Sequence, residues 1–382
     1  MLSGGGARAA YQVGCLRYLA RAMPAYRPSI LTGVSAGAIN AAHLAAFRGN
    51  WPDAVSKLSQ LWLSINTQNI YATDLSSLLR PILGWGLQVM TAGWLGTGQR
   101  RGMVDNRALK EFLCAALPNE RGRLSGIADN LAEGLLESLA IITTNYGSGQ
   151  SVAWVEGENA RSWSRGQLRA NNTKITVDHI MASSALPLFF PAVKLGRAWH
   201  GDGGVRLTAP LSPAMHMGAT RILAVSPRAT PTQALPIDQR EPYPAPAQIA
   251  GTLLNAVFLD MLDYDALQMN RINQLLAKLP QEAHGSYRPV EVFVLRPRED
   301  LGVLAREHEI KLPSAFRFFE KGLRDQRARS ADALSMVIFE PEYLALLMRL
   351  GEEDTAARHD EIAAFLNAEH SPGALQESSR QV

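Results

Sequence analysis

Cysteine is nearly absent from this chain of 382 residues, which contains only Cys15 and Cys114. Two thiols cannot build the disulfide framework on which many small secreted domains depend. Neither cysteine has a second cysteine or a histidine at the spacing typical of a metal site. The sequence therefore predicts no disulfide scaffold and no metal, and both cysteines are expected to pack in the core.

Charge is sparse and nearly balanced, with 38 basic and 35 acidic residues and a net charge of +3. Nucleic-acid-binding domains usually concentrate far more positive charge, so we expect no nucleic-acid partner. The balance is uneven only at the beginning of the chain. No acidic residue precedes Asp53, whereas the same stretch contains five arginines (Arg8, Arg17, Arg21, Arg27 and Arg48).

The first residues lack the basic segment and the apolar core of a secretory signal peptide. We therefore expect a cytoplasmic protein, or one bound peripherally to the inner face of the membrane. The first strand of a parallel sheet usually needs about five residues, whereas a glycine loop begins already at Gly4. We expect the natural chain to begin further upstream, and the sequence leaves the oligomeric state open.

One long segment, residues 81–99, carries no charge and is flanked by arginines on both sides. Its five glycines make it a poor candidate for a membrane-spanning helix. The tryptophans Trp85 and Trp94, with the flanking arginines, favour a position at a membrane interface. A buried lid or core segment explains the same composition equally well, so both interpretations stand.

A G-x-S-x-G pattern occurs early, as Gly33-Val34-Ser35-Ala36-Gly37. It follows an apolar pair, Ile30-Leu31, and it begins an alanine-rich stretch of helical character over residues 36–47. This is the context in which a serine is held on a tight strand-to-helix turn. The beginning of the helix then directs free N–H groups toward any anion formed at the serine.

A carboxylate on a glycine turn, Asp202-Gly203-Gly204, occurs much later. A serine hydroxyl needs a base before it becomes a nucleophile, and a nearby carboxylate can supply one. Taken alone, Asp-Gly-Gly is an ordinary tight turn. The turn gains chemical meaning only if the fold brings Asp202 to the serine of the earlier motif.

Three consecutive glycines near the start, Gly4, Gly5 and Gly6, leave backbone N–H groups bare, and such donors stabilise an oxyanion. The same stretch also fits a dinucleotide-binding fingerprint, with Ala9 as its last position. That fingerprint needs an acidic residue about 20 positions on to hold the ribose, and none is present there. An NADP variant that uses Arg27 stays open, but it leaves the G-x-S-x-G pattern unexplained.

Taken together and in their order along the chain (glycine loop, G-x-S-x-G, Asp-Gly-Gly), the three motifs resemble those of the patatin-like phospholipase family. The likeness is strong over residues 1–226 and includes residues 182–191, which are similar to the block that precedes the family's D-G-G turn. One departure is Ala9, where the family usually has glycine. The resemblance implies an α/β fold of three layers, α/β/α, with a parallel-rich central sheet and additional C-terminal helices.

The resemblance also implies the chemistry, a lipid acyl hydrolase that cleaves phospholipid or lysophospholipid esters without a cofactor. Ser35 attacks the ester and Asp202 takes its proton, so that the two form a dyad. The oxyanion is held by Gly4, Gly5 and Gly6, and Arg8 either fixes this loop or contacts a lipid phosphate. The remaining motif glycines shape the turns (Gly33, Gly37, Gly203 and Gly204).

Two other functions remain open. An ordinary α/β-hydrolase uses a Ser-Asp-His triad, for which His200, His216, His284 and His308 are the later histidines to consider. However, several strands precede the elbow in that fold, and here only one strand and one helix fit before Ser35. A lipid-binding or regulatory protein that kept the fold and lost useful turnover is the second alternative.

Apolar runs alternate with amphipathic stretches along the chain, a pattern typical of a sheet covered on both faces. Strands are expected over residues 29–34, 139–144, 151–155, 221–226 and 290–295. Helices are expected over residues 10–22, 36–47, 53–64, 106–116, 210–217, 253–276 and 315–336. We predict a catalytic core over residues 1–226. A proline-rich loop, a further strand and helices over residues 227–370 complete or cover it, and residues 371–382 form a disordered tail.

Overall fold

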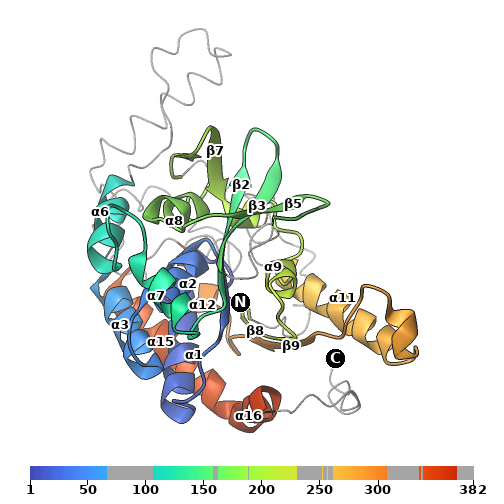
Figure 1. Ribbon diagram of the computed structural model, residues 1–382. Coiled ribbons are helices and arrows are strands. Elements are labelled where there is room, and N and C mark those ends of the chain that lie inside the picture. Colours follow the sequence, from blue (N-terminus) through green and yellow to red (C-terminus); the bar gives the residue numbers. More distant parts are fainter. Residues whose placement is uncertain are drawn as a thin grey trace, which may run out of the picture.

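The computed structural model describes residues 1–66, 106–157, 162–187, 189–229, 261–307 and 339–367, together with the single residues Thr252, Ala256, Ser335 and Met336. A central sheet lies between helices on its two faces, as a three-layer α/β/α fold (Figure 1). The predicted α/β fold class is therefore confirmed. Residues 81–99, most of the helix expected over residues 315–336 and the tail 371–382 lie outside the described residues.

The described strands are β1 (Ile30–Val34), β2 (Ser138–Asn145), β3 (Gln150–Gly157), β4 (Ser164–Arg165), β5 (Leu168–Asn172), β6 (Val193–Leu195), β7 (Ala198–Asp202), β8 (Arg221–Val225) and β9 (Glu291–Leu295). Strand β2 is central, parallel to β1 and antiparallel to β3 and β7. Strands β8 and β9 pair in parallel. Leu2 lies between these two groups and bridges both Gly33 of β1 and Val225 of β8 in parallel.

The described helices are α1 (Ala9–Ala22), α2 (Ala36–Ala46), α3 (Trp51–Ser64), α6 (Arg107–Ala116), α7 (Ser125–Ala132), α8 (Val177–Ser183), α9 (Ser212–His216), α11 (Met261–Leu276), α12 (Leu301–Glu307), α15 (Pro341–Ala357) and α16 (His359–Asn367). Short 3₁₀ turns cover Gly6–Arg8, Gly203–Val205 and Gln281–His284.

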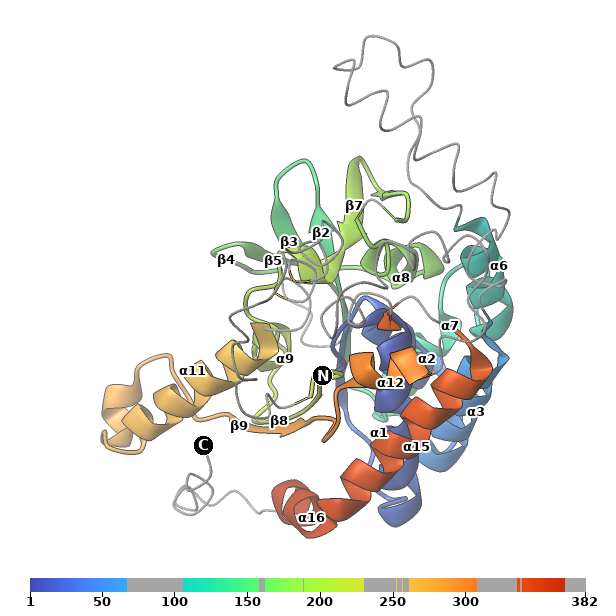
Figure 2. The ribbon, with the colours of Figure 1, turned by 180° about the vertical axis from the view of Figure 1, so that it is seen from behind.

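One face of the sheet is covered by α1, α2, α3 and α15, and α15 packs directly along α1 (Figure 2). Glycine permits this close approach. A Cβ atom on Gly14 of α1 would lie 2.7 Å from the carbonyl carbon of Met348 in α15, and one on Gly351 would lie 2.9 Å from the backbone nitrogen of Cys15. Helices α1 and α15 thus share one core, although more than 300 residues separate them along the chain.

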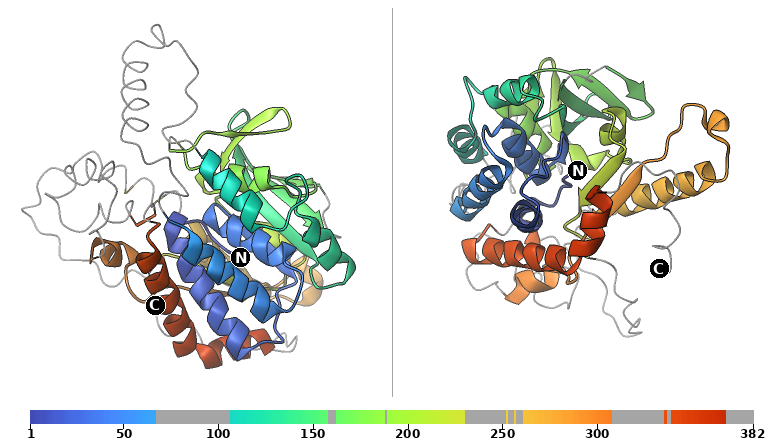
Figure 3. Two further views of the ribbon diagram at one scale, coloured as in Figure 1. Left: turned by 90° about the vertical axis from the view of Figure 1, so that its left-hand side faces the viewer. Right: turned by 60° about the horizontal axis from the view of Figure 1, so that its bottom comes forward.

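The other face is covered beside β8 and β9 by α9 and α11, where Ala214, Leu262 and Met269 pack against the sheet. Helix α11 extends away from the body of the molecule, as Figure 1 and the right-hand view of Figure 3 show. No helix among the described residues is long and apolar enough to cross a membrane.

The expected strands correspond to β1, β2, β3, β8 and β9, and the first five expected helices to α1, α2, α3, α6 and α9. Sequence reasoning missed the strands β4 to β7, of which β5 pairs in parallel with β3, and the helices α7, α8, α12, α15 and α16. Of the helix expected over residues 253–276, the structure describes α11. Cys15 is buried as expected, whereas Cys114 is only partly buried at the edge of the core.

Candidate active site

Ser35 lies at the sharp turn between β1 and α2. Its backbone has φ 54° and ψ −132°, a conformation that residues with a side chain rarely adopt. This is the backbone of a strand-to-helix elbow, which presents a serine hydroxyl at the edge of a sheet. The Ser35 side chain is nearly buried and makes no capping hydrogen bond to α2. Its hydroxyl is therefore not used by the helix.

The motif glycines sit where backbone crowds against backbone. A Cβ atom on Gly33 would lie 2.6 Å from the Gly37 carbonyl oxygen, and one on Gly37 would lie 2.5 Å from the carbonyl oxygen of Ser3. A Cβ atom on Gly203 would lie 2.6 Å from the carbonyl carbon of Ile142. The Cβ atom of an alanine at any of these positions would therefore force the neighbouring backbone to move.

Two serines at the end of α8 hold the backbone of the elbow. The Ser35 N–H donates to Ser183 Oγ at 3.0 Å, and the Ser183 hydroxyl donates to the Ile142 carbonyl of β2 at 2.6 Å. The Ser184 hydroxyl donates to the Ser35 carbonyl at 3.1 Å. Sequence reasoning placed both serines in a motif block but assigned no role to them, because only the folded chain brings α8 to the elbow.

Asp202 is fully buried at the end of β7, which pairs with β2. Its Oδ1 accepts the Gly204 N–H at 2.8 Å, and the Thr144 hydroxyl donates to its backbone carbonyl at 2.8 Å. Among the described residues, no hydrogen bond of regular geometry reaches the other carboxylate oxygen, Oδ2. The Ser35 hydroxyl nevertheless lies near enough to lower the pKa of this carboxylate. The fold thus brings the two predicted catalytic residues together.

Burial raises the pKa of Asp202 from 3.8 to about 7, and the nearby Ser35 hydroxyl and the Gly204 N–H offset this only in part. A carboxylate with a pKa near 7 is a stronger base than an exposed aspartate. Its proton affinity is therefore matched to general-base chemistry near neutral pH.

The glycine loop passes directly beside Ser35. A Cβ atom on Gly4 would lie 3.0 Å from Ser35 Cβ and 3.7 Å from its Oγ. Gly5 and Gly6 have φ values of 149° and 57°, which favour glycine. Neither donates its N–H to another described residue, and both line one cavity with Ser35. Bare N–H groups in this position are suited to hold a negative oxygen.

Arg8 and Ala9 follow the loop and are both buried. The Arg8 Nε donates to Ser335 Oγ at 2.6 Å, which ties the loop to a distant part of the chain. This contact favours the loop-fixing role of Arg8 over contact with a lipid phosphate. Ala9 has φ −66° and ψ −12°, an ordinary helical conformation at the beginning of α1. Alanine therefore adopts this position without backbone strain.

An apolar cavity of about 60 Å³ opens beside Ser35. Two glycines of the loop form one wall. The other walls include side chains of α2, α3, α6, the segment after α8 and the region before α15 (Ile39, Trp62, Leu109, Leu186, Phe190, Met336 and Phe339). Trp62 is fixed there because its Nε1 donates to Asn40 Oδ1 at 2.6 Å. No charged side chain among the described residues lines the cavity, so its chemistry matches a hydrocarbon chain.

His200 is buried and lies two residues before Asp202 in the sequence. Its ring nevertheless makes its contacts with other residues. Its Nδ1 is 3.0 Å from Thr143 Oγ1, and its ring packs against Trp154 with the ring centroids 5.4 Å apart. Burial lowers the pKa of His200 to about 4, so the imidazole is neutral at physiological pH. These contacts are those of a structural histidine.

The other histidines considered for a triad are also engaged away from Asp202. His216 packs on Trp163 with the ring centroids 4.0 Å apart. His284 Nε2 lies 2.9 Å from the Leu276 carbonyl, beyond the end of α11. His308 lies outside the described residues.

The elbow, the buried carboxylate and the glycine loop all fall within the first 215 residues, and a family model described as patatin-like phospholipase matches residues 1–215, more than half of the chain. The chain belongs to the patatin-like phospholipase family. The predicted family is thereby confirmed, and with it membership in a family of lipid acyl hydrolases.

A search of curated proteins finds no match for this patatin-like chain. Among solved structures, it is similar to VipD from Legionella pneumophila at 13% sequence identity and a TM-score of 0.38. That match covers 94% of this chain and 66% of the VipD chain.

The described residues of this patatin-like protein contain no group of three or more His, Cys, Asp or Glu side chains placed to hold a metal ion. The chemical groups at the candidate site are instead a hydroxyl, a carboxylate and backbone N–H donors. Groups of these kinds can transfer a proton or form a hydrogen bond.

Proposed function

We propose that this protein hydrolyses the carboxylic esters of phospholipids or lysophospholipids through a Ser35–Asp202 dyad. The proposal rests chiefly on one observation: the hydroxyl at a strained elbow lies between a buried carboxylate and bare glycine N–H groups. Ser35 and the glycine loop also line an apolar cavity, and this supports an acyl chain as the group transferred.

In the first half of the reaction, Ser35 Oγ attacks the ester carbonyl carbon while its proton passes to Asp202 Oδ2. The carbonyl oxygen becomes an oxyanion, which the N–H groups of Gly5 and Gly6, with Gly4 beside them, stabilise. The carbon–oxygen bond to the alcohol then breaks. The alcohol leaves with the proton from Asp202, and the acyl group remains bonded to Ser35.

In the second half, water attacks the acyl-enzyme and gives a proton to Asp202. The same N–H groups hold the second oxyanion. When the bond to Ser35 Oγ breaks, the proton returns to that oxygen and the fatty acid is released. One carboxylate therefore serves as base and then as acid in each half, and no histidine is needed.

The proposed substrate lies in a membrane, so peripheral binding to the inner membrane face is part of the proposal. Lifting an acyl chain into water costs about 0.8 kcal/mol per CH₂ group, and a docked enzyme avoids this exposure. The segment proposed to contact lipid, residues 81–99, lies outside the described residues. A cytoplasmic location accompanies this proposal.

Labelling with a fluorophosphonate probe tests the proposal directly. The parent protein should be labelled at Ser35 alone, and Ser35→Ala should lose both labelling and ester hydrolysis while its thermal midpoint changes little. Asp202→Asn should lose most activity, since general-base assistance is worth about 10²–10⁴-fold. Labelling of Ser35→Ala at another serine would overturn the assignment of the nucleophile.

The same assay separates the two alternatives. In a triad enzyme, one of the four histidines considered (His200, His216, His284 or His308) would be as necessary as Asp202, and its change to Gln would be as inactive as Asp202→Asn. We expect each of these four single variants to stay within about tenfold of the parent, or 1.4 kcal/mol of barrier. In a lipid-binding protein without turnover, the parent would bind vesicles but would resist the probe. Ala9→Gly is the matched control for that case, because it restores the glycine of the family pattern at the one position where this chain departs from it. The backbone of Ala9 is unstrained, so the change should leave the fold intact.

A further inference from the structure

A series of buried hydrogen bonds connects the wall of the apolar cavity to the backbone beside the glycine loop. Trp62 Nε1 donates to Asn40 Oδ1 at 2.6 Å, and Asn40 Nδ2 donates to Gln12 Oε1 at 3.0 Å. Gln12 Nε2 then donates to the Ser3 carbonyl at 2.7 Å. Trp62, Asn40 and Gln12 come from α3, α2 and α1, and all three are fully buried. We call these three side chains the amide network.

The direction of every hydrogen bond in the amide network follows from the indole. An indole N–H can only donate, so the Asn40 atom that meets it is the carbonyl oxygen. The Asn40 amino group therefore points to Gln12 and meets the carbonyl oxygen of that side chain. The Gln12 amino group is left to donate to the backbone. Trp62 thus determines which end of each amide faces the glycine loop.

Both amides use both of their N–H bonds. Asn40 Nδ2 also donates to the Ala9 carbonyl at 3.3 Å, and Gln12 Nε2 also donates to the Val225 carbonyl at 3.4 Å. A buried polar network in which every donor is used is rigid and specifies one arrangement. Ser3 precedes the glycine loop and Ala9 follows it by a few residues, so the amide network holds the backbone on both sides of the loop.

The glycine loop cannot fix its own shape. Three glycines in succession have no side chains to pack, and glycine has more backbone freedom than any other residue. Gly5 and Gly6 have φ values of 149° and 57°. An oxyanion site nevertheless needs N–H donors that are in place before the negative charge develops. The position of the loop must therefore be imposed by contacts with the rest of the protein.

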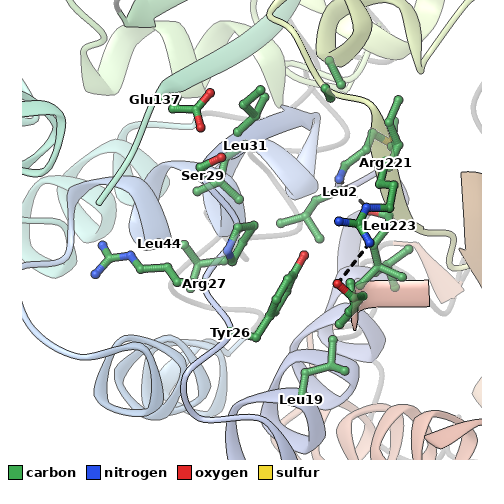
Figure 4. Close-up of a pocket in the computed structure, with 18 of the residues that line it drawn as sticks. Leu2, Leu19, Tyr26, Arg27, Ser29, Leu31, Leu44, Glu137, Arg221 and Leu223 are labelled. Atoms are coloured by element: carbon green, nitrogen blue, oxygen red, sulfur yellow. Dashed lines mark hydrogen bonds between the residues drawn. The ribbon is translucent and has the colours of Figure 1, made fainter. Parts of the chain in front are cut away.

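The chain just before the loop runs between β1 and β8. Figure 4, a close-up of the neighbouring cavity, shows Leu2 between Leu31 of β1 and Leu223 of β8. The backbone groups of such a strand face its two neighbours in turn. The Leu2 N–H donates to a carbonyl of β1 at 2.8 Å, whereas the Ser3 N–H donates to the Val225 carbonyl of β8 at 3.4 Å.

This alternation directs the Gly4 N–H toward Ser35. The Ser3 carbonyl lies on the β8 side, since it shares the Gln12 amino group with the Val225 carbonyl. The C=O and N–H of a trans peptide point in opposite directions, so the Gly4 N–H is directed toward the end of β1. A Cβ atom on Gly4 would lie 3.0 Å from Ser35 Cβ. Rotation of this peptide would therefore turn a donor away from the nucleophile.

We infer that Gln12 is a positioning residue for the proposed hydrolysis and that it acts through the Ser3–Gly4 peptide. The inference rests on the proposed function, because it concerns the oxyanion donors of that reaction. Gln12 holds the peptide, Asn40 aligns Gln12, and Trp62 aligns Asn40. Because Trp62 also lines the apolar cavity, one network holds both the wall that meets the acyl chain and the donors that meet the ester oxygen.

Gln12→Met tests this inference, with Asn130→Leu as the matched control. Methionine keeps the length of glutamine but donates no hydrogen bond. Asn130 is likewise a fully buried amide that donates to two backbone carbonyls, those of Ala45 and Phe47 at 2.8 and 3.0 Å. These carbonyls lie at the C-terminal end of α2, away from the elbow. Thermal unfolding of both variants measures how much stability each one loses.

With a short soluble ester, Gln12→Met should lower kcat by roughly ten- to a hundredfold and leave KM within about twofold, because the donors of the loop act on the transition state. Asn130→Leu should keep the kcat of the parent. Amide hydrogen exchange at residues 4–6 does not depend on turnover, and it should be faster in Gln12→Met only. An unchanged kcat in Gln12→Met, or an equal loss of kcat in both variants, would overturn the positioning role.

Trp62→Phe keeps the inference testable if Gln12→Met does not fold. It removes the N–H that aligns Asn40 but leaves Gln12 in place, so kcat should fall by a smaller factor and exchange at residues 4–6 should rise. No change in either quantity would overturn the inference.

The variant with both changes should have a kcat within about twofold of that of Gln12→Met, because the two changes break one network. Fully additive losses would show that Trp62 acts independently of Gln12, and the network would then be wrong. Fluorophosphonate labelling of the parent at Ser35 is measured in parallel. A parent that is not labelled refutes the hydrolase, while hydrogen exchange at residues 4–6 still tests whether Gln12 holds the loop.

Discussion

Replacing Asp202 with asparagine should make the protein more stable above pH 7 while it removes activity. Burial holds the pKa of Asp202 at about 7 rather than 3.8, so the folded protein binds this proton more tightly than the unfolded chain does. Ionisation of the buried carboxylate therefore lowers the unfolding free energy of the parent. This loss is absent below pH 4, grows as the pH rises from 4 to 7, and is complete above pH 7.

The size of the effect follows from the shift in pKa. About three pKa units correspond to about 4 kcal/mol of unfolding free energy at high pH. With an unfolding entropy of about 2.1 cal/mol/K per residue, a chain of 382 residues changes its free energy by about 0.8 kcal/mol per degree near the midpoint. Removing this whole penalty should therefore raise the thermal midpoint by about 5 °C. Asparagine keeps an oxygen for the Gly204 N–H and places its amide group toward Ser35, so no buried polar group loses its partner.

Thermal unfolding of the parent, Asp202→Asn and Ser35→Ala at pH 5 and pH 8 measures this effect. The stabilisation by asparagine at pH 5 should be less than half of that at pH 8. Ser35→Ala keeps the buried carboxylate and removes a hydroxyl that lowers its pKa, so its stability should depend on pH at least as strongly as that of the parent. An Asp202→Asn protein that is less stable than the parent at pH 8, or equally stabilised at both pH values, would refute the reasoning.

Four further outcomes are expected. The kcat/KM for a short soluble ester should rise with pH to a plateau above an apparent pKa near 7, because only ionised Asp202 accepts a proton; a flat profile from pH 5 to 9 contradicts this. Ser183→Ala leaves the elbow N–H buried without its acceptor and should lower the unfolding free energy by about 1–3 kcal/mol, as measured by denaturant titration. Ile39→Phe narrows the apolar cavity and should reduce hydrolysis of octanoyl esters at least tenfold relative to acetyl esters, with Ile39→Leu as the control. Replacing Trp85 and Trp94 with serine should weaken binding to anionic vesicles and bilayer hydrolysis, while a soluble ester is still cleaved; a parallel fall of both activities with the thermal midpoint would instead indicate core residues.

The elbow was predictable because its geometry is local. An apolar strand, two glycines around a serine and an alanine-rich helix fall within one short stretch of chain, and their order alone specifies the turn. The same holds for α1 and α2, whose apolar residues recur at helical spacing. By contrast, α15 was missed although it contributes to the same core. Its position depends on the close approach of Gly14 and Gly351, which no local pattern reveals.

The supports of the elbow were also beyond the reach of the sequence. Ser183 and Ser184 lie almost 150 residues from Ser35 along the chain, and serines in a turn are unremarkable by composition. Their role appears only when α8 packs against the end of β2. The short strands β6 and β7 pose the same problem, because a three-residue and a five-residue strand carry too few alternations to fix a register without tertiary contacts.

The property that separates Asp202 from an ordinary Asp-Gly-Gly turn is burial, which the sequence does not encode locally. In an exposed turn, this carboxylate would have a pKa near 4 and would be a weak base toward a serine hydroxyl. Here Asp202 ends β7 beside β2 and is fully buried, and its pKa rises to about 7. The same desolvation that strengthens the base destabilises the folded protein above neutral pH. Loss of activity and gain of stability in Asp202→Asn are therefore two consequences of one cause, and they should be observed together.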